Sequence, residues 1–197
     1  MKHLVVASTN PGKVREIREV LEGLAAWSVD SLPEDLPLAE ETGSTFLENA
    51  IQKAEFYSRN LTGGDRWIVA DDSGLVVDAL DGRPGLFSSR YAPTDEARNQ
   101  KLLRELEGVT GDQRSAQFVC ALAFAKDGQT LWTTEGRIDG TIAVEPIGDN
   151  GFGYDPLFLL PDRNQTTGQL PPETKLRISH RGIALARLRE YLEGSDF

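Results

Sequence analysis

The sequence predicts an α/β fold in which helices flank a central mixed β-sheet. Runs typical of strands alternate with segments of helical periodicity along the chain, which favours strands joined through helices. The dipeptide Asp127-Gly128 lies between two apolar runs and is a strong signal for an antiparallel hairpin. No shift in composition marks a linker, so we expect a single domain over residues 1–197.

The first strand and the first helix are marked at their junction. Residues 4–7 form a short β-type apolar run, which Asn10, a preferred N-cap residue, follows. Pro11 suits the first helical position because its ring fixes φ and it has no N–H group to satisfy. The apolar stripe of this helix consists of Val14, Ile17, Leu21 and Leu24.

A loop rich in proline and acids at residues 32–43 precedes a second predicted helix. Thr45 and Glu48 have the spacing of a capping box at its start. The apolar stripe of the second helix consists of Leu47, Ile51, Ala54 and Tyr57.

A strand over residues 67–70 runs into Asp71 and Asp72, and residues 75–77 continue the extended pattern. Thr94 is then placed to cap a third helix. Two further strands, at residues 117–126 and 130–134, flank the hairpin turn, and a segment rich in turns precedes an apolar run at residues 154–160. The last helix carries Ala184, Leu185, Leu188, Tyr191 and Leu192.

Composition excludes several classes of function. The 197 residues are 39% hydrophobic and 26% charged, which fits a globular domain with a sizeable core. The net charge of −10 disfavours nucleic acid polymers and anionic membranes as partners, because both attract a basic surface. The apolar run at residues 4–7 is too short for a signal peptide or a membrane span, so we expect a cytoplasmic protein.

Cysteine and histidine are too scarce to build common redox or zinc sites. Cys120 is the single cysteine and lies in an apolar stretch, so we interpret it as a small core residue. His3 and His180 are the only histidines, which excludes a zinc site rich in histidine.

The first candidate site lies where the first strand meets the first helix. It consists of Ser8, Thr9, Asn10, Pro11, Gly12 and Lys13. Free backbone N–H groups, the positive end of the helix dipole, hydroxyls and a lysine all favour phosphate at such a junction. The alternative is a capped surface helix with an exposed lysine.

Acidic pairs form the second candidate site. Glu40 and Glu41 precede the second helix, while Asp71 and Asp72 end an apolar strand. Carboxylates at a strand end are costly to bury without a counter-charge, and Mg²⁺ is a natural one that also bridges phosphates. Solvated turns are the alternative for both pairs.

Two segments near the C-terminus complete the candidate residues. Residues 151–156 contain two aromatic residues, each preceded by a glycine, and one carboxylate, and an aromatic ring beside flexible backbone can stack on a base. The second segment concentrates cations in an acidic protein, at Lys175, Arg177, His180 and Arg181. A packed turn and a solvated basic helix start are the respective alternatives.

Five ordered blocks of the chain together resemble the Ham1-type family of inosine and xanthosine triphosphate pyrophosphatases. The blocks are residues 8–16, 40–50, 70–75, 151–156 and 179–182. The resemblance implies an elongated α/β fold with a cleft between two lobes, a homodimer and dependence on Mg²⁺. It also implies cleavage of deaminated purine nucleoside triphosphates (ITP, dITP, XTP) to the monophosphate and pyrophosphate.

The resemblance assigns roles on the phosphate side of a substrate. Residues 8–13 would hold the triphosphate, and Glu40 with Asp72 would hold Mg²⁺. Asp72 would also be the general base that activates water. Ser73 would assist substrate binding, and the role of Asp71 stays open.

The resemblance also assigns a base pocket. Hypoxanthine and xanthine present a 6-oxo acceptor where adenine presents an amino donor, so cationic donors favour the 6-oxo bases. Phe152 would stack on the base, which Lys175, His180 and Arg181 would contact, with Gly153, Tyr154 and Asp155 close by. Guanine keeps the 6-oxo group, so its exclusion would depend on the 2-amino position.

Two other functions remain open at this point. The same residues would suit a nucleotide sensor without hydrolysis, although Glu40 and Asp72 argue against it. A pyrophosphatase of modified pyrimidine nucleotides, as in the related Maf-like enzymes, is disfavoured by Lys175 and residues 179–181. The chain departs from the family pattern at Gln169, where an acid is common, which leaves the structural role of that acid in doubt.

Overall fold

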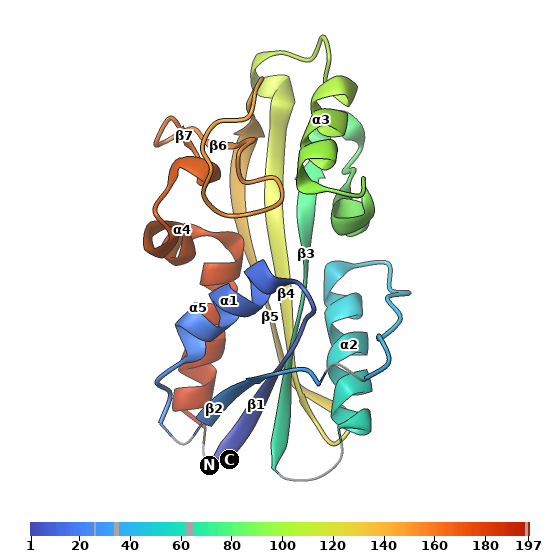
Figure 1. The fold of residues 1–197 in the computed structure, drawn as a ribbon, viewed down its shortest axis with the longest axis vertical. Helices are drawn as coiled ribbons and strands as arrows, with labels where there is room; N and C mark the ends of the chain where they lie inside the picture. Colours follow the sequence, from blue (N-terminus) through green and yellow to red (C-terminus); the bar gives the residue numbers. More distant parts are fainter. Residues whose placement is uncertain (26, 34–35, 62–64, 196) are drawn as a thin grey trace. The chain divides into compact units, whose positions relative to one another are not determined.

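The computed structural model describes residues 1–25, 27–33, 36–61, 65–195 and 197. It contains a seven-stranded sheet of order β2-β1-β3-β4-β5-β6-β7 (Figure 1). β1 pairs in parallel with β2 and β3, whereas β6 pairs antiparallel with β5 and β7, so the prediction of a mixed sheet is confirmed. The strands are β1 (Lys2–Ala7), β2 (Trp27–Ser31), β3 (Arg66–Val77), β4 (Ser115–Lys126), β5 (Gln129–Ile142), β6 (Phe158–Leu160) and β7 (Gln165–Thr166).

Five α-helices and four short 3₁₀ turns lie between and after the strands along the described part of the chain. The α-helices are α1 (Pro11–Leu21), α2 (Phe46–Asn60), α3 (Asp95–Glu105), α4 (Pro172–Ile178) and α5 (His180–Glu193). Short 3₁₀ turns are η1 (Asp78–Leu80), η2 (Gly85–Arg90), η3 (Gly111–Arg114) and η4 (Thr167–Gln169). Among the described residues, no helix is both long and apolar enough to cross a membrane.

The chain groups into two compact units. The first unit consists of residues 1–72, 120–136 and 181–197, and the second of residues 73–119 and 137–180. β3, β4 and β5 each contribute residues to both units. The expectation of a single domain over residues 1–197 stays a prediction.

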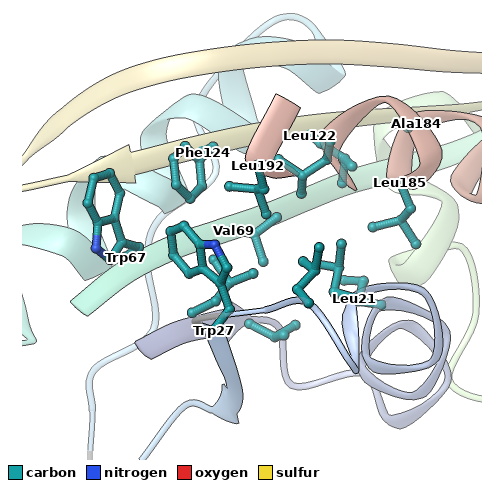
Figure 2. Packing of buried hydrophobic residues seen from close by; sticks show 14 of the residues in the cluster. Leu21, Trp27, Trp67, Val69, Leu122, Phe124, Ala184, Leu185 and Leu192 are labelled. Atoms are coloured by element: carbon teal, nitrogen blue, oxygen red, sulfur yellow. The ribbon is translucent and has the colours of Figure 1, made fainter. Parts of the chain in front are cut away.

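Two apolar clusters cover the two faces of the sheet in the first unit. One cluster joins α1 and α5 to side chains such as Val69 and Leu122, and includes Trp27 and Phe124 (Figure 2). The other joins α2 to Ile68 and to alanines on the opposite face of β3 and β4. Successive residues of a strand point to opposite faces, so Val69 and Ile68 enter different clusters.

The predicted helix starts are confirmed, with one correction. Asn10, Thr45 and Thr94 are the N-caps of α1, α2 and α3, and each side chain accepts a backbone N–H bond from the first turn. Glu48 does not complete a capping box with Thr45, however. Its carboxylate accepts both the backbone N–H and the hydroxyl of Ser44, at 2.7 Å each, so it fixes the residue before the cap.

The turn interpretation of Asp71 and Asp72 is wrong, because both acids lie inside the twelve-residue strand β3. Residues 71–74 remain extended despite their turn-forming composition, since pairing within the sheet outweighs local preference. The hairpin at Asp127 and Gly128 is confirmed, with φ values of 51° and 80° that suit a tight hairpin turn.

Several elements differ from their predicted bounds. The apolar run at residues 154–160 yields only the short strand β6, because the Tyr154 carbonyl accepts the N–H groups of Leu157 and Phe158 and so closes a turn. β2 and α4 were not predicted. β2 ends at Ser31, and the described part of the predicted loop at residues 32–43 contains no helix or strand. Residues 34 and 35 of this loop lie outside the described residues.

Candidate active site

The turn between β1 and α1 satisfies its own donors. The Asn10 side-chain oxygen accepts the N–H groups of Gly12 at 2.9 Å and Lys13 at 3.1 Å. The Ser8 hydroxyl in turn accepts the N–H of Asn10 at 3.2 Å. The expectation of free N–H groups is therefore wrong at these three residues, and a phosphate that used them would have to displace side-chain acceptors.

Replacing Asn10 with Ala tests the cap. We expect the free energy of unfolding to fall by about 1 kcal/mol, because the N–H groups of Gly12 and Lys13 lose their acceptor. Urea unfolding followed by circular dichroism measures the change. Asn10→Asp, which keeps the acceptor, should stay close to the wild type, and equal loss in both variants would contradict the capping role.

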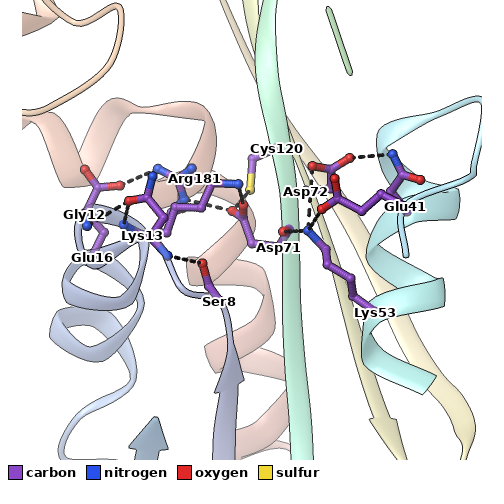
Figure 3. Close-up of polar contacts among 12 residues, drawn as sticks. Ser8, Gly12, Lys13, Glu16, Glu41, Lys53, Asp71, Asp72, Cys120 and Arg181 are labelled. Atoms are coloured by element: carbon purple, nitrogen blue, oxygen red, sulfur yellow. Dashed lines mark hydrogen bonds and ion pairs between the residues drawn. The ribbon is translucent and has the colours of Figure 1, made fainter. Parts of the chain in front are cut away.

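Asp71 is the centre of a buried ion network in the first unit (Figure 3). Its Oδ2 accepts the Nε–H of Arg181 at 2.9 Å and the thiol of Cys120 at 3.0 Å. Its Oδ1 forms an ion pair with the ammonium of Lys13. Arg181 also donates from an Nη to Glu16 at 2.6 Å. The network joins α1, β3, β4 and α5.

Opposite charges keep this network ionised. Burial would raise the pKa of Asp71, but Arg181 and Lys13 hold that pKa well below its usual value. Burial acts in the opposite direction on Arg181, whose pKa is nevertheless raised by Asp71 and Glu16. Burial, and then the charge of Asp71, raises the pKa of Cys120 well above its usual value. Cys120 is thus a core thiol, as predicted, with a polar partner.

Asp72 points to the other face of the sheet, toward α2. Its Oδ2 accepts from the amide of Asn49 at 3.0 Å, and the ammonium of Lys53 lies 3.8 Å from its Oδ1. Lys53 also donates to Glu41 at 2.8 Å and to the backbone carbonyl of Asp71 at 2.7 Å. Burial raises the pKa of Asp72, Lys53 and Lys13 oppose that rise, and Glu41 adds to it. The net effect is a pKa above the usual value for this carboxyl.

Asn49 and Lys53 were missed by sequence reasoning. They follow the cap residue Thr45 at successive intervals of four, so all three lie along one stripe of α2. That polar stripe beside the apolar one was the signal that could have identified them.

Glu40 and Glu41 differ in their surroundings. Glu40 is exposed in the loop before α2, whereas Glu41 reaches the Lys53 ammonium and acts on Asp72. Within the described residues, no three His, Cys, Asp or Glu side chains gather as a metal site. Mg²⁺ takes one or two carboxylates and fills its shell with water and substrate phosphates. Asp72, with Glu41 close enough to act on it, supplies the carboxylates that such a Mg²⁺ site requires.

Two of the predicted base-side residues, Phe152 and Lys175, contact a third, Asp155, in the second unit. Its Oδ2 accepts the backbone N–H of Phe152 at 2.8 Å and the ammonium of Lys175 at 2.6 Å, while its Oδ1 accepts the Thr167 hydroxyl at 2.9 Å. The Lys175 ammonium lies 4.8 Å from the centroid of the Phe152 ring. Lys175, His180 and Arg181 are buried, so the interpretation of these cations as a solvated helix start is wrong, although Arg177 is exposed.

The other predicted substrate residues have different surroundings. His180 is buried with its ring stacked on Phe118, at 4.6 Å between centroids. The Tyr154 side chain is in the core, where its hydroxyl donates to the Ser88 carbonyl at 2.9 Å. Gly153 has a φ of 63° and donates its N–H to Asp95 at 2.7 Å. Ser73 is half-buried on β3.

Gln169 keeps a structural role despite its lack of charge. Its side-chain oxygen accepts the N–H of Thr166 at 2.9 Å and completes a capping box for η4. Glutamine serves as well as glutamate in such a box.

Comparisons with known proteins identify the family of the chain. A model of the Ham1 family matches residues 4–191. A dITP/XTP pyrophosphatase of Geobacillus kaustophilus (strain HTA426) is 52% identical over 198 residues, which cover 98% of this chain and 95% of the relative. A protein of the same name from Bacillus subtilis (strain 168) is 46% identical over 198 residues, with 98% of each chain covered.

Solved structures of similar proteins also match the fold of this chain. A HAM1 protein from Coxiella burnetii matches with a TM-score of 0.87 and 43% identity, over 99% of this chain and 100% of that one. A nucleoside-triphosphatase, or dITP/XTP pyrophosphatase, from Mycobacterium abscessus matches with a TM-score of 0.72 and 42% identity, over 94% of this chain and 97% of that one. With a family model that spans nearly all of its length, the chain belongs to the Ham1 family.

Proposed function

We propose that this chain hydrolyses ITP, dITP and XTP to the nucleoside monophosphate and pyrophosphate, and so clears deaminated purines from the nucleotide pool. Relatives named for dITP/XTP pyrophosphatase activity match it over almost their whole length. The observation that carries the proposal is the pair of neighbours on β3. Asp72 is a buried carboxylate held by Asn49 and flanked by Lys53, and Asp71 pairs with Lys13, the cation of the phosphate turn.

On the phosphate side, Lys13 and the turn at residues 8–13 would bind the triphosphate. Asp72 would accept a proton from water, and the water oxygen would then attack the phosphorus next to the nucleoside. The bond to the second phosphate breaks and pyrophosphate leaves with the electron pair. Lys13 would stabilise the charge that develops on the phosphate oxygens.

Mg²⁺ is the cofactor that we propose for this reaction. Asp72 and a glutamate of the pair Glu40 and Glu41 would hold it together with substrate phosphates. When bound, the ion would neutralise phosphate charge and polarise the phosphoryl oxygens.

On the base side, we propose that Phe152 stacks on the purine and that Lys175, His180 and Arg181 favour a 6-oxo group. Asp155, with both carboxylate oxygens already engaged, would hold Phe152 and Lys175 in place for that role. Gly153, Tyr154 and Ser73 would add substrate contacts.

We further propose that the protein acts on free nucleotides in the cytoplasm as a homodimer. A net charge of −10 supports small nucleotides over nucleic acid polymers or anionic membranes as its partners.

Turnover of a nucleotide panel with Mg²⁺ tests the function. We expect pyrophosphate from ITP, dITP and XTP, with ATP slower by roughly 10⁴-fold because its 6-amino group cannot accept a hydrogen bond. GTP, dGTP, dUTP and dTTP complete the panel. Preference for pyrimidine nucleotides, orthophosphate as the first product, or nucleotide binding without turnover would each contradict the proposal.

A further inference from the structure

We propose that Asp71 is a positioning residue that anchors the Lys13 ammonium for the triphosphate. The inference rests on the proposed function and adds to it a role for the acid beside the general base. Asp71 would not touch the substrate, since its carboxylate is fully buried and engaged by Lys13, Arg181 and Cys120.

Three elements fix the Asp71 carboxylate before any ligand arrives. The strand β3 sets its backbone, and Arg181 of α5 with Cys120 of β4 engage one oxygen. Glu16 holds the guanidinium from the far side at 2.6 Å. These contacts leave the second carboxylate oxygen in a defined position, where it meets the Lys13 ammonium.

An anchored lysine suits anion binding better than a free one. A lysine ammonium has three N–H donors, so contact with one carboxylate oxygen leaves donors for phosphate. The Lys13 side chain is 16% exposed, which places it between the buried Asp71 and solvent. Holding its flexible stem in advance lowers the entropy cost of binding.

Loss of the anchor would release Lys13. Without the Asp71 carboxylate, the Lys13 ammonium loses the partner that holds it. We therefore expect weaker phosphate binding when Asp71 is neutralised, and slower turnover because Lys13 would stabilise the charge on the phosphate oxygens less well.

The experiment compares Asp71→Asn, Lys13→Met and the double variant in the full-length protein. Calorimetric binding of inorganic tripolyphosphate with Mg²⁺ reports the phosphate side without hydrolysis, and kcat and KM for ITP report turnover. We expect about tenfold weaker tripolyphosphate binding and about tenfold lower kcat in Asp71→Asn. The double variant should be no worse than Lys13→Met, because the carboxylate acts through the lysine.

Asp65→Asn is the matched control. It also removes the carboxylate partner of a lysine, Lys126, but lies outside the candidate site, so both binding and kcat should stay within about twofold of the wild type. If Asp71→Asn does not fold, the double variant, which removes one charge of each sign, still allows comparison with Lys13→Met.

Two results would overturn the anchor. Tripolyphosphate that binds Asp71→Asn as tightly as the wild type, or more tightly, would mean that Asp71 merely neutralises charge. Effects of the single variants that multiply in the double variant would mean that Asp71 acts independently of Lys13. Wild-type protein that fails to hydrolyse ITP would instead refute the proposed function, and tripolyphosphate binding would still test the anchor.

Discussion

Replacing Asp72 with Asn is expected to lower kcat for ITP by about 10³-fold, the contribution typical of a general base. The amide cannot take a proton from water, yet it still offers an oxygen to the Asn49 amide that now bonds Asp72. Steady-state release of pyrophosphate measures the loss.

The same variant should keep or gain thermal stability. Burial is the largest influence on Asp72 and raises its pKa, so the folded state disfavours the charged form of this carboxylate. Asp65→Asn, at an exposed acid just before β3, is the control and should retain turnover. Unchanged kcat in Asp72→Asn would contradict its role as the base, and a large fall in thermal midpoint would contradict the account of its burial.

Replacing Asp155 with Asn is expected to reduce the free energy of unfolding by about 3 kcal/mol, because the buried ammonium of Lys175 loses its carboxylate. The loop that carries Phe152 should also loosen, since Asp155 accepts its backbone N–H. KM for ITP should therefore rise together with the loss of stability. Urea unfolding measures the loss of stability, and KM for ITP, compared with KM for ATP as the 6-amino substrate, measures the effect on the base side.

The double variant Asp155→Asn with Lys175→Met separates these effects. It removes both buried charges, so stability should recover most of the loss, while the preference for a 6-oxo base should not return. A double variant as unstable as Asp155→Asn would show that the hydrogen bonds to Phe152 and Thr167 dominate, and not the ion pair.

Local signals in the sequence were sufficient for much of the fold. Asn10, Thr45 and Thr94 each mark a helix start because a cap depends on neighbours only a few residues away. The same holds for the hairpin at Asp127 and Gly128. β2 was missed because only Trp27 and Val29 of its five residues are apolar, which is too short an alternation to stand out, and it owes its conformation to parallel pairing with β1.

Local signals could not show which polar residues meet. Cys120 on β4 contacts Asp71 from 49 residues away in sequence, and Arg181 on α5 contacts it from 110 residues away. The cations at residues 175–181 lie close together in sequence, yet Lys175 pairs with Asp155 in the second unit and Arg181 with Asp71 in the first. Tertiary contacts decide such pairings, and composition alone does not contain them.

The pleat of β3 makes two chemically identical neighbours unlike. Asp71 faces α1 and α5 among cations that keep it charged, while Asp72 faces α2 and holds its proton more readily (Figure 3). An insertion or deletion of one residue between Arg66 and Asp71 would exchange the two faces and with them the two roles. Length variation in this family should therefore be excluded from the first half of β3 and tolerated in loops, such as the one before α2.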